Sequence, residues 1–472
     1  MYKIVFERSK YQLVEMVALS FMGIRETAEL ERGSQDSFGW FVKVILIMFI
    51  ILRGIMFMKK YRSMLMLFLS AVLLVGCQAE EGITDAEGET SGEITVWAHP
   101  YSQDPEAEGA MFDEIMANFE KESGVKVNFE QIPWANRDQK VLTALAANNG
   151  PDVFYVIPDQ MPQYAEAGML LDLSPYLKDN DMEDFVETAL ISTTWKDKVY
   201  GLPVLQSADT LMYNVDVVKA IGEDPAKLPA TWEEFEEWAA KAKEKGYYAT
   251  SFQGGGSMNG TLYPFLWQAG GEVLTEDNEV LINNEAGVKA FEFINNMYKN
   301  EWVPKDSITA MHHDELWDSG KMMAVTGSGI SISRMLAKED AFEFVLAPPL
   351  KNEKQATYGT TGMFVAPINS DNPDAAAEFI KFMTNSENQR AFNTVTQYIP
   401  SRKSAKDIFD DQEYMAQLAT YTEYALPGVI HPEGRNIMPL IQAELQTMME
   451  GKKTPKEAAD AAAEAIKGKV GK

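Results

Sequence analysis

The feature of the sequence that most limits its fold is an alternation of strand-like and helix-like segments between residues 93 and 156. Residues 93–98 and 125–129 show strand patterns, and residues 152–156 are apolar enough for a buried parallel strand. Apolar residues at helical spacing occupy the two intervening segments, at 111–119 and about 137–147. Three strands joined by two helices at this spacing predict an open α/β sheet.

The length and charge of the chain limit what the protein can be. The chain has 472 residues, and the part from Cys77 onward exceeds the roughly 250–300 residues at which single hydrophobic cores stop growing. We therefore expect two domains. The formal net charge is −28. This charge disfavours nucleic acid as a partner, because phosphate binding needs clustered Lys and Arg side chains, and a well-solvated secreted surface is sufficient to explain it.

Cys77 is the only cysteine of the chain and ends an export-like segment. A basic start at residues 58–62 precedes an apolar stretch from about residue 63 to 75, which is shorter than the roughly 20 residues that a membrane-spanning helix needs. Leu74-Val75-Gly76-Cys77 resembles the lipobox of bacterial lipoproteins. The resemblance implies that residues 58–76 are a signal peptide and that a lipid on Cys77 anchors the protein to the outer face of the cytoplasmic membrane. No thiol then remains for a disulfide, a zinc site or nucleophilic catalysis.

The segments on either side of this signal differ in expected role. Residues 77–92 begin with Cys77 and continue as a polar, acidic stretch poor in apolar residues, so we expect a flexible tether there. Residues 1–57 precede the signal, which normally begins a chain, so we expect them to be absent from the mature protein. An upstream start codon chosen in error would explain this extension, and a genuine N-terminal cytoplasmic extension is the alternative.

Later segments add helices to the predicted architecture. Thr231 and Glu234 form a capping-box pattern that opens a helix to about Lys245, in which Trp232 and Trp238 are expected in the core. The alanine-rich segment 454–467 predicts a C-terminal helix that ends at Gly468.

Short motifs along the chain, in a fixed order, carry a family resemblance. From about Glu93 to the C-terminus the chain resembles the extracellular solute-binding proteins of sugar-type ABC importers, a group that includes maltodextrin-binding proteins. The motifs include Ile94-Thr95-Val96-Trp97, Gly150-Pro151-Asp152-Val153, Tyr200-Gly201-Leu202-Pro203, Leu211-Met212-Tyr213-Asn214, Ser319-Gly320-Lys321-Met322-Met323, Tyr358-Gly359-Thr360-Thr361-Gly362 and Ile399-Pro400-Ser401.

The resemblance implies an α/β protein with the two-lobe, type II periplasmic-binding-protein fold, whose lobes are joined by crossing hinge segments. We place the crossings near residues 204–211, 324–327 and 372–377. The N-terminal lobe is then 93–203 plus 328–371, and the C-terminal lobe is 204–327 plus 372–472. The family implies a sugar ligand, ABC permease subunits with a cytoplasmic ATPase as partners, no cofactor and no enzymatic activity, and we expect a monomer.

Candidate ligand contacts follow from the rule that open α/β sheets bind ligands beyond the carboxyl ends of their strands. A sugar needs aromatic rings against its C–H face and carboxylates or amides around its hydroxyls. The resemblance also puts Asp159 where maltodextrin binders carry a sugar-contacting aspartate. The candidates from the first lobe are Trp97, His99, Tyr101, Trp134, Asp159 and Gln160, and those from the crossings, the loop at 359–362 and the second lobe are Gln206, Asp209, Trp267, Thr360, Thr361, Glu433 and Arg435.

One departure from the family pattern limits the expected ligand. Where maltodextrin binders carry a stacking tryptophan soon after the second crossing, this chain has Ser328-Gly329-Ile330. A mono- or short oligosaccharide is therefore expected rather than a long glucan. Most of the candidate side chains also fit purely structural roles, such as a buried tryptophan or a surface pair of Glu433 with Arg435.

Two other classes of function stay open at this stage. A surface glycosidase would use two carboxylates that flank a glycosidic bond. A binder of glycerol phosphates, polyamines or iron could use the same fold. A phosphorylated ligand would need cationic side chains, and only Arg137 and Arg435 are available near the candidates. Iron would need clustered ligands, and His312 with His313 is weak evidence because adjacent residues of a helix point in different directions.

Overall fold

The computed structural model describes residues 92–135, 137–178 and 180–471. The predicted extension, the signal peptide, Cys77 and all of the tether except Gly92 lie outside the described residues. No helix in the described part of the chain has the length and apolar character needed to cross a bilayer.

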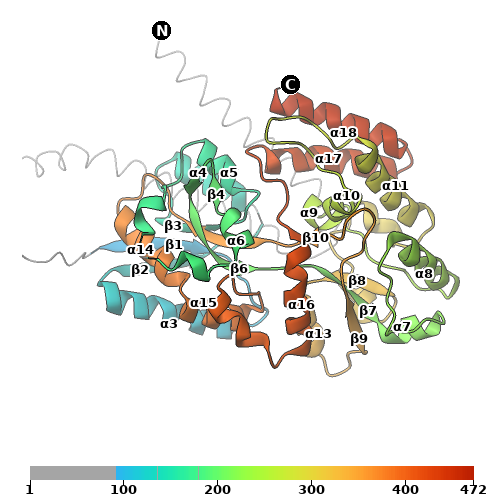
Figure 1. The fold of residues 1–472 in the computed structure, drawn as a ribbon, viewed down its shortest axis with the longest axis horizontal. Helices are drawn as coiled ribbons and strands as arrows, with labels where there is room; N and C mark the ends of the chain where they lie inside the picture. Colours follow the sequence, from blue (N-terminus) through green and yellow to red (C-terminus); the bar gives the residue numbers. More distant parts are fainter. Residues whose placement is uncertain (1–91, 136, 179, 472) are drawn as a thin grey trace, which may run out of the picture. The chain divides into compact units, whose positions relative to one another are not determined.

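A five-stranded sheet organises the first lobe, with the strand order β2-β1-β3-β11-β6 (Figure 1). β1 pairs in parallel with β2 and β3, which agrees with the alternation of strands and helices in the sequence. β11 runs antiparallel to both β3 and β6. The strands are β1 (Glu93–Ala98), β2 (Lys126–Gln131), β3 (Val153–Val156), β6 (Gly201–Gln206) and β11 (Thr361–Val365).

Helices cover both faces of this sheet, because side chains alternate along each strand. In β1, Ile94 and Val96 face a core shared with α3, α14 and α15, whereas Trp97 faces the other core, shared with α4 and α5. These helices are α3 (Pro105–Ser123), α4 (Arg137–Ala146), α5 (Met161–Glu166), α14 (Pro373–Met383) and α15 (Ser386–Thr396), and the lobe also contains α6 (Glu187–Ile191), β4 (Thr194–Trp195) and β5 (Lys198–Val199).

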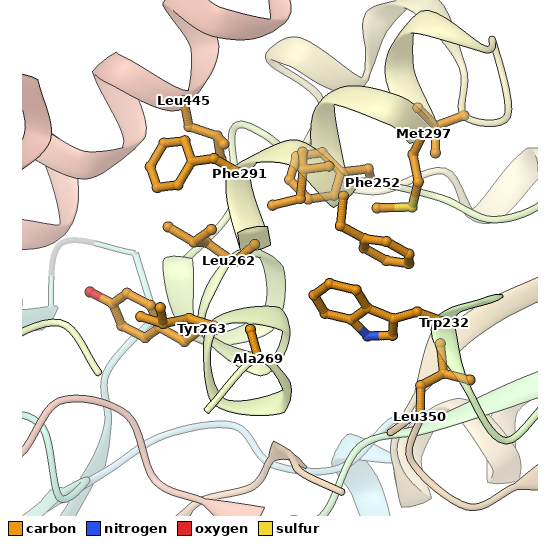
Figure 2. Close-up of a cluster of buried hydrophobic side chains, with 14 of the residues drawn as sticks. Trp232, Phe252, Leu262, Tyr263, Ala269, Phe291, Met297, Leu350 and Leu445 are labelled. Atoms are coloured by element: carbon orange, nitrogen blue, oxygen red, sulfur yellow. The ribbon is translucent and has the colours of Figure 1, made fainter. Parts of the chain in front are cut away.

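A three-stranded antiparallel sheet, β8-β7-β9, organises the second lobe. Its largest core lies among α8, α10, α11, α17 and α18, and Figure 2 shows Trp232, Phe252 and Phe291 packed within it. The capping box of Thr231 and Glu234 is present, and Trp232 and Trp238 are buried as predicted. The strands are β7 (Thr210–Asn214), β8 (Ala324–Gly327) and β9 (Phe344–Ala347), and the helices named are α8 (Trp232–Glu244), α10 (Tyr263–Gln268), α11 (Glu285–Lys299), α17 (Gly434–Met449) and α18 (Pro455–Val470).

Shorter elements complete the second lobe and the connections. They are α7 (Val215–Ala220), α9 (Met258–Thr261), α12 (Asp314–Asp318), α13 (Gly329–Leu336), β10 (Thr357–Tyr358), α16 (Glu413–Thr420) and β12 (Ala425–Leu426), with 3-10 turns at Lys305–Ile308, Lys403–Phe409 and Tyr421–Tyr424. The first lobe has two further 3-10 turns, at Ser174–Tyr176 and Met182–Asp184.

Two of the three predicted crossings are wrong. Residues 207–209 link β6 to β7 within the range given to the first crossing. The second crossing lies at 359–360 instead of 324–327, because β9 pairs with β7 in the second lobe. The third follows α15 instead of preceding α14, because Phe379 and Phe392 pack in the core of the first lobe. Residues 373–396 form the amphipathic helices α14 and α15, and amphipathicity does not say which sheet a helix covers.

The three crossings are hydrogen-bonded to one another. The backbone N–H of Ser207 donates to the Thr360 carbonyl over 2.8 Å, and the Thr360 N–H donates to Ser207 Oγ over 3.0 Å. Gln206 and Ile399 exchange backbone hydrogen bonds of 2.6 and 2.9 Å. The hinge region between the lobes is therefore one connected unit rather than three independent linkers.

The predicted end of the C-terminal helix is also wrong. Gly468 lies within α18, which begins at a capping box of Thr454 and Glu457 and continues to Val470. Gly471 caps the helix with a φ of 80°, the left-handed conformation that glycine favours. Two glycines at helix-ending spacing were available, and the sequence pattern selected the earlier one.

Candidate functional site

Four polar side chains from both lobes meet in what we term the interlobe bridge: Asp138, Asp159, Asn259 and Arg435. Asp138 is in α4 and Asp159 follows β3, whereas Asn259 is in α9 and Arg435 is in α17. Arg435 lies 3.1 Å from Asp138 Oδ2 through Nη2 and 3.3 Å from Asp159 Oδ2 through Nη1. Asn259 Nδ2 donates to Asp159 Oδ2 over 2.9 Å. The lobes are thus in direct polar contact through a shared guanidinium.

The bridge leaves Asp159 incompletely satisfied. Its side chain is 0% exposed, and Oδ1 has no hydrogen-bond partner among the described residues. Burial raises the pKa of Asp159 and outweighs the opposing effects of Arg435 and Asn259. An unsatisfied buried acceptor costs about 1–3 kcal/mol. A ligand hydroxyl that donates to Oδ1 would remove this cost and favour the ionised carboxylate.

An aromatic surface adjoins the bridge on the first lobe. Trp134 stacks on His99 with centroids 4.2 Å apart, and its Nε1–H donates to the Pro100 carbonyl over 2.6 Å. The guanidinium of Arg137 lies 4.7 Å from the Trp134 ring centroid, and its Nε is 3.5 Å from Asp138 Oδ1. Trp134 stays 38% exposed although His99 and Arg137 contact its ring, so part of a fixed aromatic side chain is open to solvent beside the bridge.

Tyrosines connect the bridge with the crossings. Tyr101 packs edge-on against Tyr155, with centroids 5.1 Å apart. Burial raises the pKa of Tyr358, and the charges of Asp159 and Asp209 raise it further. Burial and Asp209 likewise raise the pKa of Tyr398, to about 12. These phenols therefore stay neutral near pH 7 and can donate or accept hydrogen bonds.

A larger cleft beside the crossings is separate from the interlobe bridge. It has a volume of about 1120 Å³, and Gln206, Thr360 and Thr361 line it, whereas no bridge residue does. The carboxyl ends of β1, β2 and β3 lead instead to His99, Trp134 and Asp159, which is where open α/β sheets place ligands. We therefore assign the candidate ligand site to the bridge side, and the predicted site residues are divided between the two places.

Several predicted residues lie away from the bridge. Trp97 faces α4, with Lys140 Nζ 4.4 Å from its ring centroid, because it alternates with Val96 along β1. Trp267 is buried in the second-lobe core. Glu433 accepts a hydrogen bond from Asn436 over 2.8 Å.

Two other predicted residues adjoin the bridge without belonging to it. Gln160 is buried, accepts from the Ile157 N–H over 3.1 Å, and donates to Asp138. Its amide therefore orients a bridge carboxylate. Asp209 lies on the first crossing and lines a small cavity in the second lobe.

Sequence reasoning missed three residues that the structure brings to this site: Asp138, Asn259 and Tyr358. Asp138 directly follows Arg137 beyond the second strand, so the strand-edge rule could have included it. Asn259 lies in the four-residue helix α9 and Tyr358 in the two-residue strand β10. Such short elements have no periodicity that sequence analysis could detect.

Taken together, the fold and the site define a class, the two-lobed binding protein whose polar groups meet between the lobes. The family model described as "Bacterial extracellular solute-binding protein" matches residues 114–423. A galactooligosaccharide-binding protein of Bacillus subtilis is 26% identical over 434 residues, which cover 88% of this chain and 98% of the relative. A diacetylchitobiose-binding protein of Streptomyces coelicolor is 26% identical, covering 71% and 80%.

A solved structure agrees with these sequence relationships. An ABC substrate-binding protein of Listeria monocytogenes, in complex with cycloalternan, matches with a TM-score of 0.70 at 23% identity, covering 81% of this chain and 99% of that one. The chain belongs to the bacterial extracellular solute-binding proteins, as its motifs predicted. The predicted two-lobe type II fold is confirmed as well.

Proposed function

We propose that this protein captures a mono- or oligosaccharide between its lobes outside the cell and delivers it to the permease of an ABC importer with a cytoplasmic ATPase. The observation that supports it most is the interlobe bridge, in which buried Asp159 of one lobe meets Arg435 and Asn259 of the other. Closure of the lobes around a solute creates the form that a permease can recognise. Relatives named for binding galactooligosaccharide and diacetylchitobiose support the saccharide class.

The chemistry of the bridge side suits a sugar. The exposed part of the Trp134 side chain offers apolar contact to the C–H groups of a pyranose, and Asp159 Oδ1 offers an acceptor for its hydroxyls. Sequence relatives that are binding proteins support capture without chemical conversion. A surface glycosidase is the alternative, and analysis of saccharides recovered after incubation distinguishes it, because only an enzyme would shorten them.

The proposal includes export and attachment to the membrane. The lipobox-like Leu74-Val75-Gly76-Cys77 supports lipidation of Cys77, and membership of an extracellular family supports export. Replacement of the cysteine, C77A, should release the protein from the membrane fraction into the medium. Retention of the C77A variant in the membrane would contradict the anchor while leaving solute binding untouched.

The binding experiment is calorimetric titration of the purified chain with neutral mono- and oligosaccharides. We expect at least one saccharide to bind, and Asp159→Asn to weaken its binding about 10- to 100-fold, since hydrogen bonds to charged groups contribute about 1.5–3 kcal/mol. Asp172→Asn is the matched control, because Asp172 pairs with Lys198 at the surface of the same lobe and touches no bridge residue. Absence of binding by every saccharide tested, with a metal or phosphate ester bound instead, would overturn the assignment.

A further inference from the structure

A small cavity of about 180 Å³ lies in the second lobe beside the first crossing. Among the described residues, Asp209 is the only charged one that lines it. Three core residues drawn in Figure 2, Phe252, Met297 and Leu350, form part of its wall. Phe265 is a further aromatic residue of the wall, and the polar side chains of Thr250, Ser251 and Gln253 also line it.

Hydrogen bonds fix the backbone of Asp209, whereas its carboxylate has no hydrogen-bond or ion-pair partner among the described residues. Its N–H donates to the Tyr358 carbonyl over 2.8 Å, and Thr357 Oγ1 donates to its carbonyl over 2.9 Å. The carboxylate itself makes no hydrogen bond or ion pair with any residue that the structure describes. Burial alone raises the pKa of Asp209 to about 7, with no cation to oppose it.

The nearby cations are already engaged. Arg137 lies against Trp134 and pairs with Asp138, and Arg435 is shared between Asp138 and Asp159. Asp209 is nonetheless close enough to Tyr358 and Tyr398, which also adjoin the bridge side, to raise their pKa values. Asp209 therefore lies near the tyrosines that adjoin the candidate ligand site, and its carboxylate has no partner among the described residues.

We propose that Asp209 and this cavity form a subsite for a protonated amine carried by the ligand, so that amino sugars with a free amine are preferred over neutral sugars and anionic sugars are disfavoured. This inference rests on the proposed saccharide function. The cavity is smaller than the roughly 300–1,000 Å³ of whole-ligand pockets, so it fits one group of a larger ligand. An ammonium group would gain a charge-assisted hydrogen bond to Asp209, beside the aromatic side chains of Phe252 and Phe265 in the cavity wall.

The test compares probes that differ in one substituent: cellobiose, unacetylated chitobiose and diacetylchitobiose, together with glucose, glucosamine and glucuronate. In calorimetry near pH 7 we expect the free-amine probe of at least one series to bind at least tenfold more tightly than its neutral counterpart, and glucuronate to bind most weakly. Asp209→Asn should abolish the amine preference and change the affinity for neutral probes by less than about threefold. Asp209→Glu, which keeps the charge, should retain part of the preference.

The pH dependence gives a second readout. The neighbouring phenols of Tyr358 and Tyr398 stay neutral between pH 5 and 7, whereas Asp209 in the cavity wall titrates near pH 7. Its carboxylate becomes protonated as the pH falls, so the amine preference should shrink from pH 7 to pH 5 in the unmodified protein and stay absent in D209N.

Two outcomes would overturn the subsite, and each is distinguishable from failure of the proposed function. Binding of neutral saccharides with no amine preference, or an equal loss for amine and neutral probes in D209N, refutes the role of Asp209 and leaves saccharide capture intact. Binding of no saccharide at all refutes the proposed function itself.

Discussion

Asp159 and Asp209 are two aspartates of the interlobe region. The carboxylate of Asp159 has partners in Arg435 and Asn259, whereas that of Asp209 has none among the described residues. Asp159 is opposed by Arg435 and Asn259, which offset part of the effect of burial on its pKa. Asp209 has burial as the sole cause of its raised pKa. A carboxylate without compensation is retained at a cost to stability, and such sites are frequently functional.

The raised pKa of Asp209 predicts a pH-dependent stability. Its pKa is about 7 in the folded chain against an ordinary value of 3.8, so the folded state holds a proton that the unfolded state releases between about pH 4 and pH 7. The contribution of Asp209 to the free energy of unfolding therefore falls as the pH rises through this window. The melting temperature of D209N minus that of the unmodified protein should increase from pH 4 to pH 7 and then level off.

Asp172→Asn provides a control of opposite sign for that measurement. Burial of Asp172 is outweighed by its hydrogen bonds with Ser174 and by Lys198, so its pKa is lowered in the folded chain. Its carboxylate then stabilises the fold above the ordinary pKa. D172N should lose stability relative to the unmodified protein as the pH rises toward 3.8 and then keep a constant deficit from pH 4 to pH 7. A melting difference for D209N that does not change from pH 4 to pH 7 would contradict the assignment.

Single residues of the candidate site could be predicted from the sequence only where they follow a strand with a clear pattern. His99, Trp134 and Asp159 were found because each follows a strand whose pattern is clear. Trp97 was misjudged although it lies on the same strand as Val96, because the alternation that turns it toward α4 was not applied to it. Arg435 and Asn259 come from the other lobe, and only the tertiary fold brings them to Asp159.

At the scale of elements, the first and second crossings pack with their backbones in close contact at Gly359 and Ser207. A Cβ at Gly359 would lie 2.1 Å from the Ser207 carbonyl oxygen, and this oxygen cannot move without shifting the first crossing. Gly359→Ala should therefore destabilise the protein by about 1–3 kcal/mol or more, measured by urea unfolding.

Gly468→Ala is the matched control for that substitution. A Cβ at Gly468, an exposed position within α18, would meet nothing within 4 Å. Alanine is the better helix former there by up to about 1 kcal/mol, so G468A should stabilise the protein slightly. Equal effects of the two substitutions would show that backbone contact at the crossings does not matter.

Elements themselves were easier to predict from the sequence than their assignment to lobes. The first three strands and the helices between them have strong periodic patterns, and Thr231 with Glu234 marks a helix start by local hydrogen bonds. Residues 328–358 and 372–396 were placed in the wrong lobes. Their patterns show that one face is apolar, whereas strand pairing and core packing, which decide the lobe, join residues far apart in sequence.

For the molecule as a whole, we expect Arg435 to link ligand capture to lobe closure. It is the only cation of the interlobe bridge in the described part of the chain, and it neutralises carboxylates from the opposite lobe. A ligand shifts an open–closed equilibrium only by its differential affinity for the closed form. A bridge within the protein biases the same equilibrium before any ligand arrives, so the affinity for every ligand should depend on it.

Arg435→Met tests this link, because it removes the charge while retaining much of the side-chain volume. We expect the ligand-free variant to be more open, with a larger radius of gyration in solution scattering, and to bind its saccharide about tenfold or more weakly, since Asp159 is left buried without its cation. Lys469→Met is the control, because Lys469 pairs at 3.6 Å with Glu433 within the second lobe.

High salt should weaken binding by the unmodified protein more than by R435M, because screening acts on the ion pairs that the variant has already lost. If R435M keeps the scattering profile and the affinity of the unmodified protein, closure does not depend on the bridge and must be driven by the ligand alone.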